Sequence, residues 1–185
     1  MTADFPRLVS LACHDLRTPL ATMQGFAKTL LRREDLDEVT VRWLGMIEIA
    51  GDELVELIEL LSLAARIESG RYEPVVRESD SLELAQAAVP EATGVGTAVN
   101  VDAGALERSL VALARAARRH GGVDVAMSVE GHRIAIEPVD EPAARVVLGE
   151  ELKDLGAAVA VRAVRAAGGS VEHEGRRVVV TLPAV

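Results

Sequence analysis

Two long stretches at the start of the chain place apolar residues at alternating spacings of three and four. In residues 4–33 the repeat consists of Val9, Cys13, Leu16, Leu20, Met23, Ala27 and Leu30. In the stretch that ends at Gly70 it consists of Leu44, Ile47, Gly51, Leu54, Ile58, Leu61 and Ala65. This heptad spacing predicts two amphipathic helices that pack along a common seam.

The charged run between Arg32 and Glu38 interrupts the repeat and predicts a hairpin turn, with Thr40 as the cap of the second helix and Gly70 as its stop signal. A single hairpin has more apolar surface than it can hide. We therefore expect a homodimer, in which two copies form a four-helix bundle. The alternative is a monomer whose hairpin folds onto the rest of the chain.

After Gly70 the sequence changes character, which divides the chain into predicted domains at residues 1–70 and 71–185. Residues 71–76 read as a linker running into a strand. Apolar periodicity predicts helices at residues 81–89, 104–119 and 149–167, and strands at 94–101, 123–129, 132–137, 171–174 and 177–182. The predicted fold class is α+β, with a helical hairpin followed by an α/β sandwich whose helices cover one sheet face.

The composition of the chain narrows the range of functions that we expect. A net charge of −9 argues against a nucleic-acid partner, because such proteins need a basic surface over the phosphates. Cys13 is the single cysteine, so the chain forms no internal disulfide, and a reducing cytoplasm is the expected location. No window reaches the roughly 18 uninterrupted apolar residues of a membrane span, and we expect no membrane association.

The run His14-Asp15-Leu16-Arg17-Thr18-Pro19-Leu20 lies in the first helix and carries the candidate chemistry. A neutral imidazole is a nucleophile near neutral pH. The Asp15 carboxylate can accept a hydrogen bond from one ring nitrogen of His14 and leave the other nitrogen free to attack. The alternative is that Asp15 is an ordinary solvated helix residue. Thr18 follows at the spacing that shares a helix face, and Pro19 should bend the helix.

This run resembles the phospho-acceptor box of two-component sensor histidine kinases. The resemblance implies that His14 carries a phosphoryl group to or from an aspartate of a response-regulator receiver domain. It implies that Asp15 orients the ring and that Thr18 positions water for dephosphorylating the regulator. We assign Arg17, Pro19 and Lys28 to the surface that binds the receiver, with a plain surface salt bridge as the alternative for Arg17.

The second domain resembles the ATP-binding domain of the same kinases in shortened form, through residues 156–159, Gly168-Gly169 and Thr181-Leu182-Pro183. The positions that bind nucleotide in that family differ. Ala112 and Ala116 replace two asparagines, of which the second holds magnesium, and an alanine methyl cannot ligate a metal. The Asp-x-Gly-x-Gly box reads Asp140-Glu141-Pro142-Ala143-Ala144, which we interpret as an exposed loop stiffened by proline.

The phosphate loop keeps only Gly156, and about fifteen residues separate it from Asp140, too few for a mobile lid. We therefore expect no cofactor and no metal, with Asp140 as a nucleotide contact only if ATP is bound. The leading hypothesis is a histidine phosphotransferase of a phosphorelay that works without ATP and magnesium. The alternatives are a divergent ATP-dependent histidine kinase, and a non-catalytic docking dimer or phosphatase.

Overall fold

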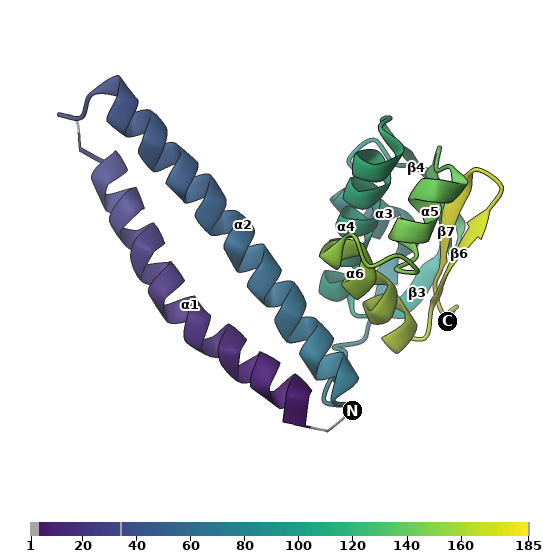
Figure 1. Ribbon diagram of the computed structural model, residues 1–185. Coiled ribbons are helices and arrows are strands. Elements are labelled where there is room, and N and C mark those ends of the chain that lie inside the picture. The colour runs from purple at the N-terminus through teal and green to yellow at the C-terminus, as the bar shows by residue number, and fades with distance from the viewer. Residues whose placement is uncertain (1–3, 34, 185) are drawn as a thin grey trace. The chain divides into compact units, whose positions relative to one another are not determined.

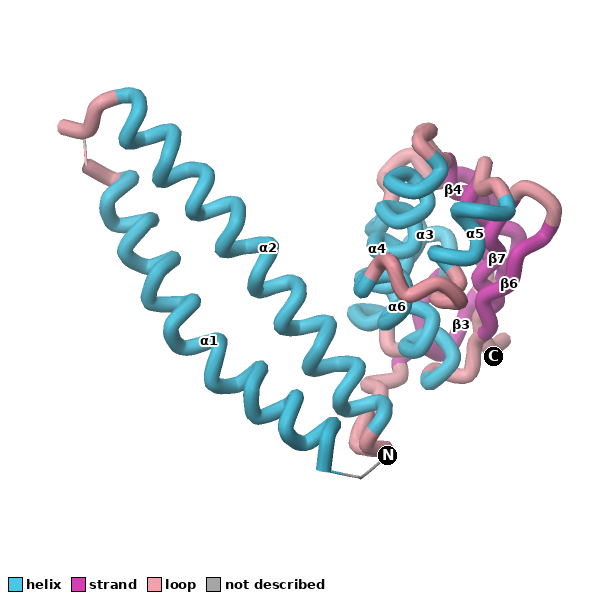
Figure 2. The backbone as a smooth tube through the Cα atoms, in the orientation of Figure 1, coloured by secondary structure: helices cyan, strands magenta, loops and turns pink. Residues whose placement is uncertain are grey.

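The computed structural model describes residues 4–33 and 35–184, and the chain divides into two compact units, Met1–Gly70 and Arg71–Val185. The first unit consists of helices α1 (Asp4–Leu31) and α2 (Glu38–Glu68). Figures 1 and 2 show these two long helices running antiparallel. No helix in the described ranges is long and apolar enough to cross a membrane.

The ends and the course of the helices follow from single residues. Asp37, and not Thr40, caps α2, because the Asp37 carboxylate accepts a hydrogen bond from the Thr40 backbone N–H at 2.9 Å and another from the Thr40 hydroxyl. These bonds lower the pKa of Asp37 below its ordinary value. Helix α1 continues through Pro19, and Figure 1 shows that it curves near the middle of its length.

Only half of the predicted seam is buried within the hairpin. The buried positions recur every seven residues and are Cys13, Leu20 and Ala27 of α1 and Leu44, Gly51, Ile58 and Ala65 of α2. The positions three residues further on are exposed by between 36% and 58%; they are Leu16, Met23, Leu30, Ile47, Leu54 and Leu61. Each helix therefore presents an apolar stripe that the hairpin leaves uncovered.

Polar side chains connect α1 and α2 on a face of the hairpin that is separate from the exposed apolar stripes. Arg17 donates to the Ser62 hydroxyl at 3.4 Å, Gln24 donates to the Asp52 carboxylate at 2.7 Å, and Lys28 lies 3.7 Å from Glu48. Gly51 makes room for one of these contacts, because a Cβ there would lie 2.8 Å from Cγ of Gln24. We call the side of the hairpin that carries these contacts the polar face.

The second unit contains two sheets. Strands β2 (Thr93–Gly96), β4 (Ala126–Gly131), β5 (Arg133–Glu137), β7 (Arg177–Thr181) and β6 (Ser170–Glu174) form a five-stranded sheet in this order, with β2 parallel to β4 and the other pairs antiparallel. Strands β1 (Arg77–Asp80) and β3 (Ala98–Val101) form a separate antiparallel pair. The strand predicted over residues 94–101 is therefore two strands in different sheets, divided at Thr97.

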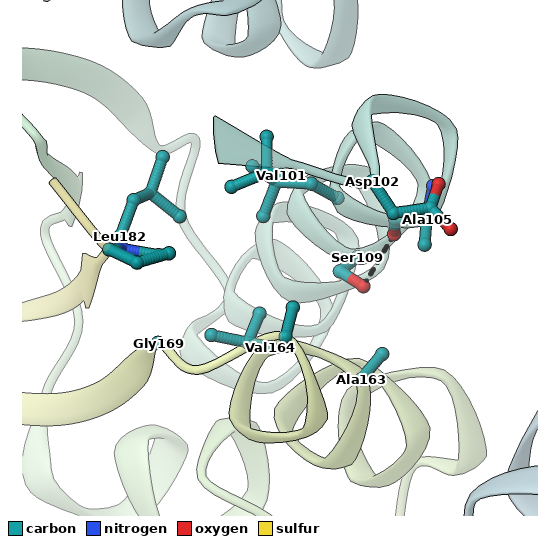
Figure 3. Close-up of a pocket in the computed structure, with 11 residues that line it drawn as sticks. Val101, Asp102, Ala105, Ser109, Ala163, Val164, Gly169 and Leu182 are labelled. Carbon is teal, nitrogen blue, oxygen red and sulfur yellow. Dashed lines mark hydrogen bonds between the residues drawn. The ribbon is translucent and has the colours of Figure 1, made fainter. Parts of the chain in front are cut away.

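Helices α3 (Ser81–Ala88), α4 (Ala103–Gly121), α5 (Glu141–Val147) and α6 (Leu155–Ala166) complete the second unit. Figure 1 shows α4, α5 and α6 on the same side of the sheet. Helices α4 and α6 pack closely, and Figure 3 shows Ser109 of α4 beside Ala163 and Val164 of α6. This α/β unit after a helical hairpin is the α+β arrangement that the sequence predicts.

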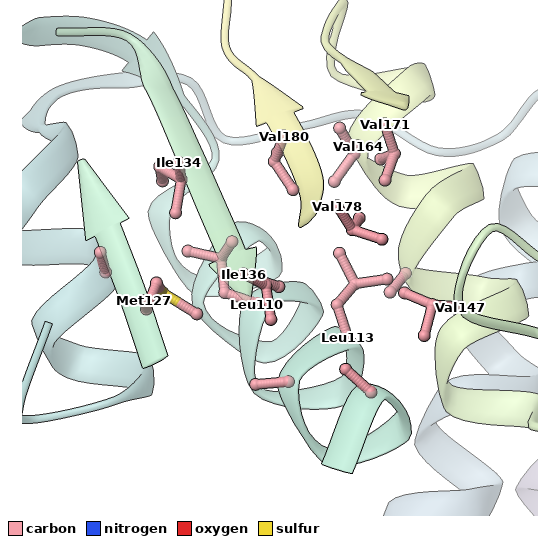
Figure 4. Close-up of a cluster of buried hydrophobic side chains, with 14 of the residues drawn as sticks. Leu110, Leu113, Met127, Ile134, Ile136, Val147, Val164, Val171, Val178 and Val180 are labelled. Carbon is pink, nitrogen blue, oxygen red and sulfur yellow. The ribbon is translucent and has the colours of Figure 1, made fainter. Parts of the chain in front are cut away.

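The core lies between the sheet and the helices. Leu110 and Leu113 of α4 are fully buried against apolar side chains of the strands, as Figure 4 shows. The register places Ile134 opposite Val180 and Ile136 opposite Val178, so that large side chains line the same sheet face. The core is filled without many aromatic side chains, because buried alanines on α4, α5 and α6 let these helices pack close together.

Two further elements differ from the sequence-based prediction. Residues 141–147 form helix α5, not a loop, because Asp140 caps it by accepting from the Ala143 N–H at 3.0 Å and Pro142 lies in the first turn. The helix predicted from Gly149 begins only at Leu155, where the Asp154 carboxylate accepts from the Ala157 N–H at 3.0 Å.

Candidate functional site

His14 lies on α1 with 78% of its side chain exposed, one residue after the buried Cys13. Cys13 is 2% exposed and fixes the rotation of the helix, so its neighbour must face solvent. His14 Nδ1 lies 3.1 Å from Asp15 Oδ1. When Nδ1 carries the proton, it donates to this carboxylate and Nε2 keeps its lone pair, which makes Nε2 the nucleophilic atom.

Thr18 and Pro19 follow on the same helix, and both are exposed. The Thr18 carbonyl accepts the Thr22 hydroxyl at 3.0 Å, while the Thr18 hydroxyl has no hydrogen bond recorded among the described residues. Pro19 has no N–H, so the Asp15 carbonyl loses its regular helical donor. The helix next to His14 is thereby weakened on one side without being broken.

Arg17 and Lys28 lie with His14 on the polar face of the hairpin. Arg17 is held by Ser62, and Lys28 lies near Glu48. Both side chains are exposed, so each remains accessible to a partner. Ser62 was not singled out from the sequence; the antiparallel register of the two heptad helices is the signal that would have placed it opposite Arg17.

In the second unit, Ala112 and Ala116, the two positions where the resemblance expects asparagines, lie on α4. Ala116 has no exposed surface, and Ala112 is partly buried against the same core. The facing residues of α6 are also buried, with Ala157 at 0% and Val161 at 2% exposure. Among the described residues, apolar side chains of the same buried cluster surround Ala116.

Several charged groups near α5 and α6 are paired within the chain. Glu151 accepts from Lys153 at 2.6 Å and lies 3.4 Å from Arg145, and the Lys153 contact lowers the pKa of Glu151. Asp154 lies 3.3 Å from Arg119 and 3.4 Å from His120. The carboxylates thus neutralise the cations that a phosphate would otherwise meet.

Asp140 uses one carboxylate oxygen to cap α5, and Gly156 lies inside the first turn of α6. Neither residue belongs to a glycine-rich loop that could close around phosphates.

A small cavity of about 10 Å³ lies between α4 and α6, lined by residues that include Asp102, Ala105, Ser109 and Leu182 (Figure 3). This volume admits about one water molecule and no nucleotide. The Ser109 hydroxyl beside it already donates to the Ala105 carbonyl at 2.7 Å. Among the residues that the structure describes, no group of three or more His, Cys, Asp or Glu side chains is placed to hold a metal ion.

The sequence of this chain is similar to those of known proteins. Residues 7–70 match the His Kinase A (phospho-acceptor) domain. The sensor protein KdpD of Mycobacterium tuberculosis is 34% identical over 157 residues, covering 72% of this chain and 18% of KdpD. The probable sensor histidine kinase TcrY of the same organism is 34% identical over 91 residues, covering 49% of this chain and 19% of TcrY. The chain thus spans less than a fifth of the length of these curated relatives.

Solved structures share the fold at lower identity. Full-length ShkA in complex with AMPPNP has a TM-score of 0.68 and 21% identity, covering 97% of this chain and 47% of that one. Histidine kinase AdeS of Acinetobacter baumannii has a TM-score of 0.55 and 20% identity, covering 91% of this chain and 95% of that one. The predicted fold, a helical hairpin followed by a domain like the ATP-binding domain of histidine kinases, is confirmed.

The hairpin is a phospho-acceptor domain of the His Kinase A type. Over most of its length the chain is similar to sensor proteins and histidine kinases of this kind.

Proposed function

We propose that this protein is a histidine phosphotransferase that carries a phosphoryl group on His14 between receiver domains of response regulators, without using ATP. The observation that carries the proposal is the exposed His14 ring with Nδ1 3.1 Å from the Asp15 carboxylate, on a match to the phospho-acceptor domain. Exposure lets a receiver reach Nε2, and the carboxylate sets the tautomer that leaves Nε2 free.

The transfer step needs no oxidant and no additional cofactor on this chain. Nε2 of His14 attacks the phosphorus of a receiver's aspartyl phosphate, so that an N–P bond forms while the bond from phosphorus to the aspartate oxygen breaks. The aspartate leaves as a carboxylate. The ring then carries a positive charge beside Asp15, which stabilises it, and the reverse step passes the phosphoryl group to a second receiver.

The second unit supports ATP independence. Ala116 is fully buried where the family resemblance expects a magnesium ligand, and Asp140 caps a helix where it expects an adenine contact. Arg145 and Lys153 are paired with acidic side chains. In this proposal the domain is a scaffold that keeps the kinase fold without its nucleotide site.

The exposed apolar stripes support a homodimer. In both helices each exposed seam residue follows a buried one by three positions, as Leu16 follows Cys13 and Leu54 follows Gly51. Because the helices run antiparallel, the same offset turns both stripes to one side of the hairpin. Pairing of two such sides buries them in a four-helix bundle. His14 follows Cys13 by one position and lies on the opposite side, clear of this interface.

A second candidate is an ATP-dependent histidine kinase. It is favoured by the similarity to KdpD and TcrY, and by the fold shared with ShkA, whose structure holds AMPPNP. The two functions differ in nucleotide binding.

A calorimetric titration with magnesium-ATP separates the two candidates. The phosphotransferase predicts no binding up to millimolar nucleotide, and binding that is lost in Asp140→Ala would establish the kinase. In parallel, receiver domains phosphorylated with acetyl phosphate should label the wild-type chain and not His14→Gln. Labelling of His14→Gln would contradict the assignment of the acceptor, whatever the nucleotide result.

A further inference from the structure

We propose that Arg17, Ser62 and Arg66 form a cationic cradle for the phosphoryl group on His14, so that α2 takes part in the site as well as α1. The inference rests on the proposed phosphotransferase function and extends it to residues of the second helix. The evidence is the register of the hairpin, the contact between Arg17 and Ser62, and the charges along the polar face.

The residues of the polar face recur with helical spacing on α1. His14, Arg17, Gln24 and Lys28 are separated by three, seven and four residues, which places them within a sector of about 80° with His14 at one edge. Three of them contact α2 directly, namely Arg17, Gln24 and Lys28. His14 therefore lies at the solvent-facing edge of a row whose other members contact the second helix.

The partners on α2 form a matching row. Glu48 and Asp52 are four residues apart, and Ser62 and Arg66 are also four residues apart, with all four in one sector of the helix. Because the helices run antiparallel, residues nearer the N-terminus of α1 lie beside residues nearer the C-terminus of α2. Lys28 thus pairs with Glu48, and Arg17 pairs with Ser62. One further turn in this direction reaches the exposed side chains of His14 on α1 and Arg66 on α2.

Both arginines are available to an anion at that position. Arg17 donates to the neutral Ser62 hydroxyl at 3.4 Å, a long contact that holds the guanidinium beside α2 without neutralising it. Arg66 is exposed, and its guanidinium makes no ion pair with any residue in the part of the chain that the structure describes. Glu59 shares the sector but lies beyond Ser62, further from His14.

The arrangement suits a phosphoryl group that gains negative charge as it transfers. Guanidinium groups on two sides donate charge-assisted hydrogen bonds to the phosphoryl oxygens. When the phosphoryl group arrives on Nε2, Arg17 exchanges its weak bond to Ser62 for a bond to phosphate. Ser62 is thus a positioning residue that acts through Arg17, whereas Arg66 contacts the phosphoryl group itself.

Potassium phosphoramidate tests the cradle without any knowledge of the natural receiver. It transfers its phosphoryl group to an imidazole nitrogen as its P–N bond breaks and ammonia leaves. Intact-mass spectrometry would follow the rate at which the full chain is labelled. We expect Arg66→Gln to slow labelling about fivefold and Arg66→Lys to restore most of the rate.

The dependence of the rate on salt gives a readout that a merely structural role would not move. The wild-type rate should fall as ionic strength rises, and the rate of Arg66→Gln should change much less. Ser62→Ala should slow labelling about twofold, with recovery in Ser62→Thr, because only the anchor of Arg17 is lost. Arg42→Gln is the matched control, an exposed arginine of the same helix outside the polar face, and should label at the wild-type rate.

The outcomes separate this inference from the function on which it rests. If the wild-type chain is labelled on His14 and Arg66→Gln matches it in rate and in salt dependence, the cradle is wrong and the phosphotransferase stands. If Arg42→Gln slows labelling as much as Arg66→Gln, the effect is general electrostatics and the cradle is again wrong. If neither phosphoramidate nor phosphorylated receivers label the wild-type chain, the phosphotransferase and the cradle both fail.

Discussion

Replacing Ala116 with asparagine would put an amide where the family resemblance expects a magnesium ligand, and would test our proposal that this part of α4 holds no nucleotide site. If the site lacks only the ligand, the substitution should move the protein toward binding magnesium-ATP. If the site has been closed by packing, the new amide has no space and no partner. Ala116 has no exposed surface and belongs to the same buried cluster as Ala143, Ala157 and Ala160, so we predict the second result.

The expected cost follows from this burial. An amide left without hydrogen-bond partners costs about 1–3 kcal/mol, and forcing extra atoms into a packed core costs about 1–3 kcal/mol more. A total of about 3 kcal/mol would lower the melting temperature of a domain of this size by roughly 12 °C. Ala112→Asn is the matched control on the same helix. Ala112 is only partly buried, so we expect its substitution to cost about 1 kcal/mol.

Urea denaturation followed by circular dichroism would give the free energies of unfolding, and calorimetry with magnesium-ATP would show whether either variant binds nucleotide. We expect destabilisation of Ala116→Asn without binding. A variant that keeps the wild-type stability would show that the space beside Ala116 is open. Binding of magnesium-ATP to Ala116→Asn would refute the packing argument outright.

Three further predictions concern the hairpin. Leu54→Glu places a charge in the exposed apolar stripe, and light scattering should then report the mass of one chain where the wild-type protein gives two; an unchanged mass would contradict the proposed interface. Thr18→Ala should abolish dephosphorylation of a bound phospho-receiver while phosphoryl transfer from His14 continues, and radiolabel assays would measure both activities. Equal loss of dephosphorylation and transfer would contradict a separate role for Thr18 in dephosphorylation. Asp37→Ala should lower the melting temperature at neutral pH, because the hydrogen bonds from Thr40 stabilise the ionised carboxylate and lower its pKa below the ordinary value. That stability is present above the unfolded-state pKa and is lost as pH falls through the folded-state pKa, so melting curves of the two proteins should converge in strong acid.

The sequence predicted the hairpin well, because heptad spacing constrains both the type of element and the buried face. It did not predict which half of the seam a single chain covers. The spacing of Cys13 and Leu16 fits a two-helix contact and a four-helix bundle equally well. Only the packing of α1 against α2 separates the buried residue from the exposed one.

The errors in the second unit have a common origin in short-range backbone chemistry. The resemblance to a nucleotide-binding box favours a loop at residues 140–144, although an aspartate two residues before a proline is also a helix start. Thr97 ends one strand and allows the next to join another sheet, which apolar periodicity does not register. The start of α6 was placed too early because Leu148 and Leu152 continue its apolar pattern, whereas the Asp154 cap sets the true boundary.

The pattern of replacement in the second unit bears on how such a domain keeps its fold without a ligand. A cleft lined with amides and glycines is costly when empty, because its polar groups lose partners and its loops keep their entropy. Under our proposal, alanine on α4 and the capped starts of α5 and α6 remove both costs, since the helices close over the former site and each cap satisfies backbone donors. Closure of this kind couples many positions at once. Return of ATP binding would then require simultaneous changes at Ala116, in the buried residues of α6, and in the short loop before Asp154. A single substitution should therefore destabilise the domain without giving it ATP binding.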